Sequence, residues 1–295
     1  SGPTSDNGWN AGAYRAVLAV RKSLGLTPEQ SPDIENATTP GEQEENLRAF
    51  AQKGFNVVFG HGAEYEEPAL RIEHDFPNTL FVISSGSKVG EHTMPIVYRL
   101  EDAAYLLGMA AGAVTKTGKI ASVGGEQIPP VISVFNAFAL GAKAINPSVK
   151  VLPPVYTGSW DDVGKAKEAT LALLDQGADV ICQDVDAASK GVFNAVEEHK
   201  GAYALGTNNN QNDIAPDVVL ASAPIYTDKV FVEIAKAAKA GTLKPNDRPY
   251  GMKDGIVDFV WNPQLKSKVS PAAITRIDAA RAAILSGKLT VPVSR

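Results

Sequence analysis

Short β-rich runs alternate with helical stretches along this chain, and the alternation constrains the fold more than any other feature. One such unit begins at Thr39-Pro40, where a capping residue precedes a proline that favours the first turn of a helix over 42–53. Gly54 ends that helix, and a strand over 55–59 follows. The pattern predicts an α/β fold in which a mostly parallel sheet is covered by helices.

The same unit recurs further along the chain, usually with a glycine where the helix stops. Further helices are expected over 13–24, 161–176, 187–199, 227–240 and from the cap Ser270-Pro271 onward, with strands over 179–183 and 202–205.

Polar or glycine-rich loops follow the strands, and open parallel sheets bind ligands at the carboxyl ends of their strands. Such loops are expected at 5–10, 60–65, 84–88, 124–129, 158–162, 183–189 and 207–212. Two facing sheets explain so many loops more economically than one. We therefore predict an N-terminal lobe of 1–97 with 223–253, a C-terminal lobe of 98–222 with 254–295, and a ligand cleft between the lobes.

Composition excludes several classes of protein. The net charge is −5 and the basic residues are scattered, so no nucleic-acid partner is expected. The longest apolar run, 103–114, is shorter than the roughly 18 residues that span a bilayer, and it predicts a buried helix. Cys182 lies in an apolar run typical of a buried, inert thiol. The four histidines do not have the sequence spacing that is typical of metal ligands, so we expect neither a metal nor a cofactor.

The opening run Ser5-Asp6-Asn7-Gly8-Trp9-Asn10 combines an aromatic ring with polar groups. Trp9 offers a flat face to a planar ligand, and the glycine lets the backbone approach closely. The alternative is structural, with polar caps and a tryptophan in the core.

Other candidates follow the predicted strands. Gly60-His61-Gly62-Ala63-Glu64-Tyr65 lacks the third glycine of a dinucleotide-binding loop, so we interpret it as a ligand-binding or a plain connecting loop. Asp184 and Asp186 alternate at one strand end, where an acceptor suits ring N–H or amino groups; a catalytic carboxylate pair is the alternative. The full set of predicted ligand contacts is Asp6, Asn7, Trp9, Asn10, His61, Glu64, Tyr65, Ser85, Trp160, Asp184, Asp186 and Asn208.

Several ordered motifs resemble the basic membrane protein family of transporter-associated lipoproteins, whose best-known branch is the PnrA-like purine nucleoside receptors. The resemblance covers nearly the whole chain. It rests on the run 6–10, on Thr115-Lys116-Thr117-Gly118-Lys119, on 123–129, on Gly141 with Asn146-Pro147, and on 175–181. It implies a type I periplasmic-binding-protein fold, a ligand held between aromatic rings, a permease partner driven by an ATPase, and no catalysis.

The resemblance also implies an aspartate and a lysine that fix a ribose, and this chain departs from both. The aspartate position falls in the loop that contains Asn208, and the lysine position falls at or beside Ile225. Losing both members of a charge pair avoids leaving one charge unpaired in a dry site. The departure indicates changed specificity and brings a free nucleobase into competition with a nucleoside.

The sequence thus predicts a monomeric solute-binding protein of an ABC transporter that captures a purine-type ligand. By resemblance, it is a periplasmic or cell-surface lipoprotein whose membrane contact is a lipid anchor outside this chain. The alternatives are a nucleoside-processing enzyme and a ligand sensor or regulator of the same fold.

Overall fold

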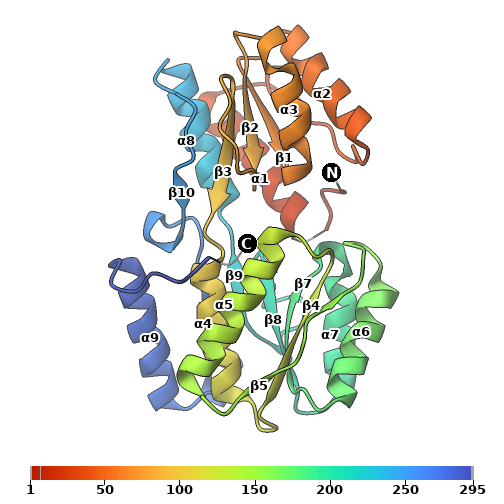
Figure 1. Ribbon diagram of the computed structural model, residues 1–295, viewed down its shortest axis with the longest axis vertical. Coiled ribbons are helices and arrows are strands. Elements are labelled where there is room, and N and C mark those ends of the chain that lie inside the picture. Colours follow the sequence, from red (N-terminus) through yellow and green to blue (C-terminus); the bar gives the residue numbers. More distant parts are fainter. Residues whose placement is uncertain (1, 7, 294–295) are drawn as a thin grey trace. The chain divides into compact units, whose positions relative to one another are not determined.

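The computed structural model describes residues 2–6 and 8–293, which form two compact units. The first unit comprises 2–6, 10–99 and 226–250, and the second comprises 8–9, 100–225 and 251–293. Each unit has mainly parallel strands with helices packed on them (Figure 1), which confirms the predicted α/β class.

The first unit contains a four-stranded sheet in the order β1-β2-β3-β10, and its strand pairs are parallel. Apolar side chains of β1, β2, α2 and α3 form its core, with Phe81 and Ile72 fully buried. The strands are β1 Val57–His61, β2 Leu80–Ser84, β3 Thr93–Tyr98 and β10 Pro249–Tyr250, and the helices are α1 Trp9–Leu24, α2 Pro40–Gln52, α3 Glu66–Ile72 and α8 Thr227–Lys239.

The second unit contains a sheet in the order β11-β9-β8-β7-β4-β5, with β6 also paired to β4. One core lies among α4, α5, α9 and the sheet, and another lies where α6 and α7 pack on it (Figure 1). The helices are α4 Glu101–Val114, α5 Pro129–Ile145, α6 Val163–Asp175, α7 Ser189–Glu198 and α9 Pro271–Leu285. The strands are β4 Lys119–Gly124, β5 Lys150–Val151, β6 Val155–Tyr156, β7 Val180–Asp184, β8 Tyr203–Asn208, β9 Val219–Pro224 and the antiparallel β11 Val260–Trp261.

Glycines let α4 and α5 approach backbone to backbone. A Cβ atom added at Gly108 would lie 1.9 Å from the Phe138 carbonyl oxygen, and one at Gly141 would lie 1.9 Å from the Tyr105 carbonyl oxygen. Neither position has room for a side chain, because the obstructing atoms belong to backbone. These contacts fix α4, the predicted buried helix, against the rest of the second unit.

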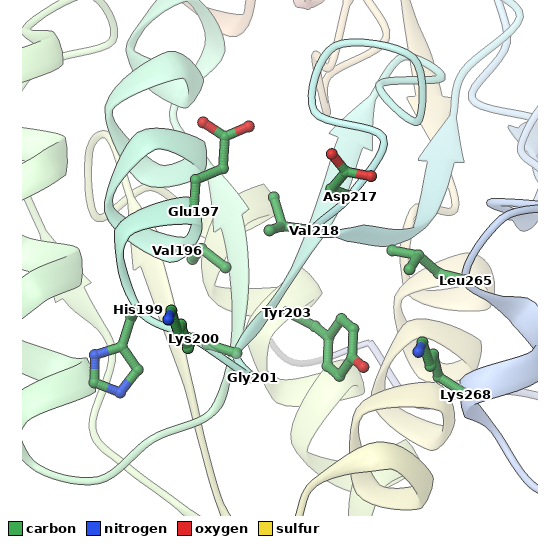
Figure 2. A pocket seen from close by; sticks show the side chains of 11 residues that line it. Val196, Glu197, His199, Lys200, Gly201, Tyr203, Asp217, Val218, Leu265 and Lys268 are labelled. Carbon is green, nitrogen blue, oxygen red and sulfur yellow. The ribbon is translucent and has the colours of Figure 1, made fainter.

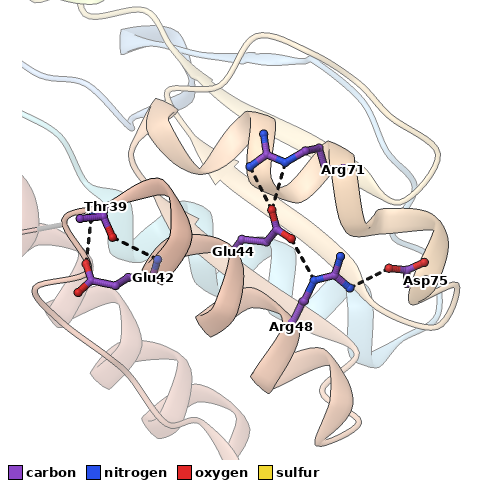
Figure 3. A network of polar contacts seen from close by, with 6 residues as sticks. All are labelled: Thr39, Glu42, Glu44, Arg48, Arg71 and Asp75. Carbon is purple, nitrogen blue, oxygen red and sulfur yellow. Dashed lines mark hydrogen bonds and ion pairs between the residues drawn. The ribbon is translucent and has the colours of Figure 1, made fainter.

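The predicted start of α2 is confirmed in detail. The Thr39 side chain accepts a hydrogen bond from the Glu42 backbone N–H, and the Glu42 carboxylate accepts one from the Thr39 N–H (Figure 3). Further along, Glu44 bridges Arg48 of α2 to Arg71 of α3. These ion pairs are solvent-exposed, so each contributes little to stability.

Several predicted boundaries were wrong. The first helix begins at Trp9 rather than residue 13, because the Asp6 carboxylate accepts hydrogen bonds from the Asn10 and Ala11 N–H groups and lengthens the helix towards the N-terminus. The first predicted strand is β1, two residues later than expected. The helix expected from residue 187 begins as a 3-10 turn over Asp186–Ala188 and becomes α7 only at Ser189.

Two predictions about apolar segments are confirmed. Cys182 is fully buried, and burial raises the pKa of its thiol, which disfavours the reactive thiolate. The apolar run 103–114 lies almost entirely inside the second unit as α4. No helix within 2–6 and 8–293 has both the length and the apolar character needed to cross a membrane.

The α4–α5 contact makes a direct prediction about stability. Gly141→Ala should lower the free energy of unfolding by about 1–3 kcal/mol or more, because its methyl group meets the Tyr105 carbonyl. Gly41→Ala is the matched control, since an added Cβ there has nothing within 4 Å. The control should be neutral or stabilising by up to about 1 kcal/mol. Urea denaturation measures both, and equal effects would contradict the close approach.

Candidate functional site

Three neighbouring strands of the second unit end at one edge of its sheet. Parallel pairing places Gly124 of β4 beside Asp184 of β7, and β8 runs parallel on the other side of β7 and ends at Asn208. Parallel strands bring their carboxyl ends together, which is where this class of sheet binds ligands. The candidate site therefore begins with the side chains at this edge.

The amide of Asn208 joins two carboxylates. Its Nδ2 donates to Asp184 Oδ1 at 2.9 Å and to Asp186 Oδ1 at 3.2 Å. The Thr207 hydroxyl lies 3.4 Å from Asp184 Oδ1 and also donates to the Gln183 carbonyl. The structure thus brings together three predicted contacts, Asp184, Asp186 and Asn208, and adds Thr207.

Asp184 is only 4% exposed although it is an acid. Burial raises the pKa of its carboxyl group to about 6, because desolvation disfavours the charged form, while the hydrogen bonds from Asn208 and Thr207 act in the opposite direction. Near neutral pH the group is mostly ionised and offers only acceptor oxygens.

Aromatic groups lie next to these acceptors. A Cβ atom added at Gly125 would lie 2.3 Å from the Trp160 ring, and one at Gly124 would lie 2.9 Å from the Tyr156 ring, so both glycines admit a ring against the backbone. The Trp160 carbonyl accepts a hydrogen bond from Ala188 N–H, in the turn that begins at Asp186. The backbone N–H of Trp9, which belongs to the second unit, lies 3.4 Å from Asp186 Oδ1.

Three residues at or just after strand ends have a left-handed backbone conformation, with positive φ. Ser85 follows β2 with φ 58°, Asp186 follows β7 with φ 45°, and Asn208 ends β8 with φ 62°. Left-handed backbone is uncommon outside glycine and costs about 1–3 kcal/mol, so it persists where the surroundings impose it, often at functional sites. All three residues belong to the predicted ligand contacts.

The first unit has its own polar strand ends. His61 of β1 and Ser84 of β2 are paired in register, and the His61 Nδ1 lies 3.0 Å from the Ser84 hydroxyl. Tyr98 of the same unit is buried, and burial raises the pKa of its phenol. The His61 ring meets Phe231 edge-on. His61 and the neighbouring Ser85 therefore lie at a pair of polar strand ends within this unit.

The remaining predicted contacts have other surroundings. Asp6 is buried, and its carboxylate accepts from the Asn10 N–H, the Asn10 side-chain amide and the Ala11 N–H, so it caps α1. Tyr65 packs into the core of the first unit, where burial raises the pKa of its phenol to about 12, whereas Glu64 is exposed. Asn7 lies outside the described residues. The ligand-binding roles of these residues, and the cleft between lobes, stay predictions.

Sequence reasoning missed Thr207 and Tyr156 at the edge of the second sheet and Tyr98 in the first unit. Thr207 and Tyr156 each lie near the end of a strand, which was the available signal. Tyr98 ends β3, a strand that is not among those predicted from the sequence.

The opposite end of β8 carries a separate pocket of about 320 Å³ (Figure 2). Tyr203 begins β8 and lines the pocket, together with charges of both signs such as Glu197, Asp217, Lys200 and Lys268. None of the predicted ligand contacts lines it. In the part of the chain that the structure describes, no three metal-ligating side chains form a cluster.

Comparison with known proteins shows the family of this chain. A family model described as ABC transporter substrate-binding protein PnrA-like matches residues 1–295. A Brucella abortus protein named as a purine-binding protein is 28% identical, over 98% of this chain and 80% of its own length. The Bacillus subtilis transcriptional activator protein med is 26% identical, over 85% of this chain and 77% of its own length.

A solved structure supports the fold. A solute-binding protein of an ABC transporter system from Aeropyrum pernix K1 superposes with a TM-score of 0.88 and 18% identity, covering 100% of this chain and 92% of that one. The fold is the type I periplasmic-binding-protein fold that the resemblance implied.

The pKa of Asp184 makes a prediction about stability and pH. A raised folded-state pKa means that the folded protein keeps this proton at a pH where the unfolded chain has lost it. Between about pH 4 and pH 6, the Asp184 contribution to the free energy of unfolding therefore falls as pH rises, by on the order of 3 kcal/mol in total. Asp184→Asn removes that contribution.

Chemical denaturation of wild type and Asp184→Asn at about pH 4.5 and pH 7.5 measures the effect. The stability of the variant relative to wild type should rise by about 2 kcal/mol between the two conditions. A difference that does not change with pH would contradict the raised pKa.

Proposed function

Because the chain belongs to the PnrA-like family of ABC transporter substrate-binding proteins, we propose that it captures a purine outside the cytoplasm and delivers it to an ABC permease. In this proposal the ligand is a free nucleobase in preference to a nucleoside, and the protein catalyses no reaction. The name of the Brucella relative supports a purine ligand.

One observation carries the preference for a free base. The Ile225 N–H donates to the Asn208 carbonyl at 3.2 Å, so these two residues, which lie in or beside the segments where the resemblance implies a charged, ribose-binding pair, are neighbours. Both are uncharged here, and Ile225 is 4% exposed. An apolar side chain offers no partner to ribose hydroxyls, and leaving those hydroxyls unpaired would cost binding free energy.

The charges around Asn208 support an uncharged residue at this position of the loop. Asn208 already donates to Asp184 and Asp186. An aspartate at position 208 would remove that donor and place a third carboxylate among two others, which is unfavourable in a partly buried site. The uncharged residue at 208 and the two acids at and just after the end of β7, Asp184 and Asp186, therefore belong to one change of specificity.

The similarity to a protein named as a transcriptional activator supports a second candidate, a ligand sensor of the same fold. A sensor and a transport protein both bind ligand, so affinity does not separate them. If the ligand-loaded protein stimulates the ATPase activity of a purified ABC permease complex from the same organism, the result would favour transport. No stimulation, with ligand bound, would favour the sensor.

Trp9→Ala should weaken purine binding by about 1–3 kcal/mol, because we place its ring against the base. Calorimetry with free bases and with the matching nucleosides measures this loss and also ranks the two ligand classes. Tyr14→Ala is the matched control, since this aromatic residue lies on the same helix and is 37% exposed.

The control should bind as wild type does, and wild type should bind the base more tightly than its nucleoside. Unchanged affinity in Trp9→Ala would remove that ring from the site. Tighter binding of nucleosides would overturn the free-base preference, and chromatographic detection of ribose release would show an enzyme.

A further inference from the structure

We propose that Asp184 Oδ2 and Asn208 Oδ1 form a pair of acceptors that selects purines carrying an exocyclic amino group. The inference rests on the proposed function and names the part of the ligand that this edge of the second sheet recognises.

Asp184 has one oxygen in use and one without a donor. Oδ1 accepts from Asn208 Nδ2 and lies within 3.4 Å of the Thr207 hydroxyl. No residue within 2–6 or 8–293 donates to Oδ2, although the residue is only 4% exposed. Oδ2 is not among the fully buried side-chain atoms, so a ligand can reach it, and a donor that the ligand supplies would pair with an acceptor that no described residue occupies.

The orientation of the Asn208 amide is set by its neighbours. A primary amide nitrogen has two hydrogens, and here two carboxylate oxygens, of Asp184 and Asp186, lie within hydrogen-bonding distance of it. The reversed amide would place its oxygen against both carboxylates, which is repulsive. The amide nitrogen is therefore held towards the acids, and no described residue donates to the Oδ1 on its other side.

Neighbouring strands hold the two acceptors at the same edge. Residues 180–182 of β7 pair in parallel with 203–205 of β8, and Asp184 and Asn208 end these strands. The distance of 2.9 Å between Asp184 Oδ1 and Asn208 Nδ2 keeps the two side chains in contact. The pair therefore acts as one surface that presents only acceptors.

Acceptors at this edge discriminate between purines by the groups on the ring. An amino group at position 6 or 2 donates hydrogen bonds to a carboxylate or amide oxygen. A 6-oxo group would instead bring a carbonyl oxygen against the carboxylate of Asp184. Adenine and 2-aminopurine carry an amino group, whereas hypoxanthine carries a 6-oxo group and an N1–H donor in its place, so the comparison measures what the amino group adds beyond the ring N–H groups.

The test compares these three bases by isothermal titration calorimetry at about pH 8. In wild type, at least one amino base should bind about tenfold more tightly than hypoxanthine, which is the size of one good hydrogen-bonded recognition pair. Asp184→Asn turns the free acceptor into an amide donor, and it should abolish that preference while hypoxanthine binding persists. Asp213→Asn, an exposed acid in the loop after β8, is the control and should keep the wild-type preference.

A second variant, Asn208→Gly, keeps the inference testable if Asp184→Asn fails to fold. Asn208→Gly removes the amide, and glycine tolerates the φ of 62° at this position, so the backbone is preserved. It should also lose the preference for an amino base. Persistence of the preference in both variants, or equal binding of all three bases by wild type, would overturn the inference while leaving the proposed function standing. Failure of every purine to bind wild type would instead overturn the proposed function, and this inference with it.

Discussion

The parallel pairing of β7 with β8 brings Asp184 and Asn208 to one edge of the second sheet, and the hydrogen bond between them sets which polar atoms that edge presents. The bond uses one oxygen of a buried acid and fixes the amide of its neighbour. Asp186 shares the same amide and lies in a left-handed conformation. Acceptors are consequently concentrated beside aromatic residues, which suits a flat, nitrogen-rich ligand.

Most of the residues that relate the chain to its family have structural roles. The Asp179 carboxylate accepts from the Thr115 hydroxyl and from the Lys116 and Thr117 N–H groups, so it joins two motifs that are far apart in the sequence. Gly141 permits the close contact of α5 with α4. Such residues hold the fold together, whereas we propose that ligand choice depends on strand-end residues such as Asn208.

Local signals explain which parts of the structure the sequence could predict. Thr39 and Ser270 cap helices as expected, because a cap depends on a few adjacent residues. The start of α1 at Trp9 was missed, since it depends on how the Asp6 side chain turns. Asp184 and Asn208 were each predicted as ligand contacts because each lies at the end of a predicted strand. Their bond, and the packing of Tyr65 into the core, required strand register and tertiary contacts that no local pattern contains.

The central claim is that this edge of the second unit holds the base of a purine. A crystal structure of the protein with adenine or 2-aminopurine tests it most directly. The account predicts an amino group of the base within hydrogen-bonding distance of Asp184 Oδ2 and Asn208 Oδ1, with the ring against Trp9 or Trp160. A base bound elsewhere, or one that turns its amino group away from Asp184, would contradict the account.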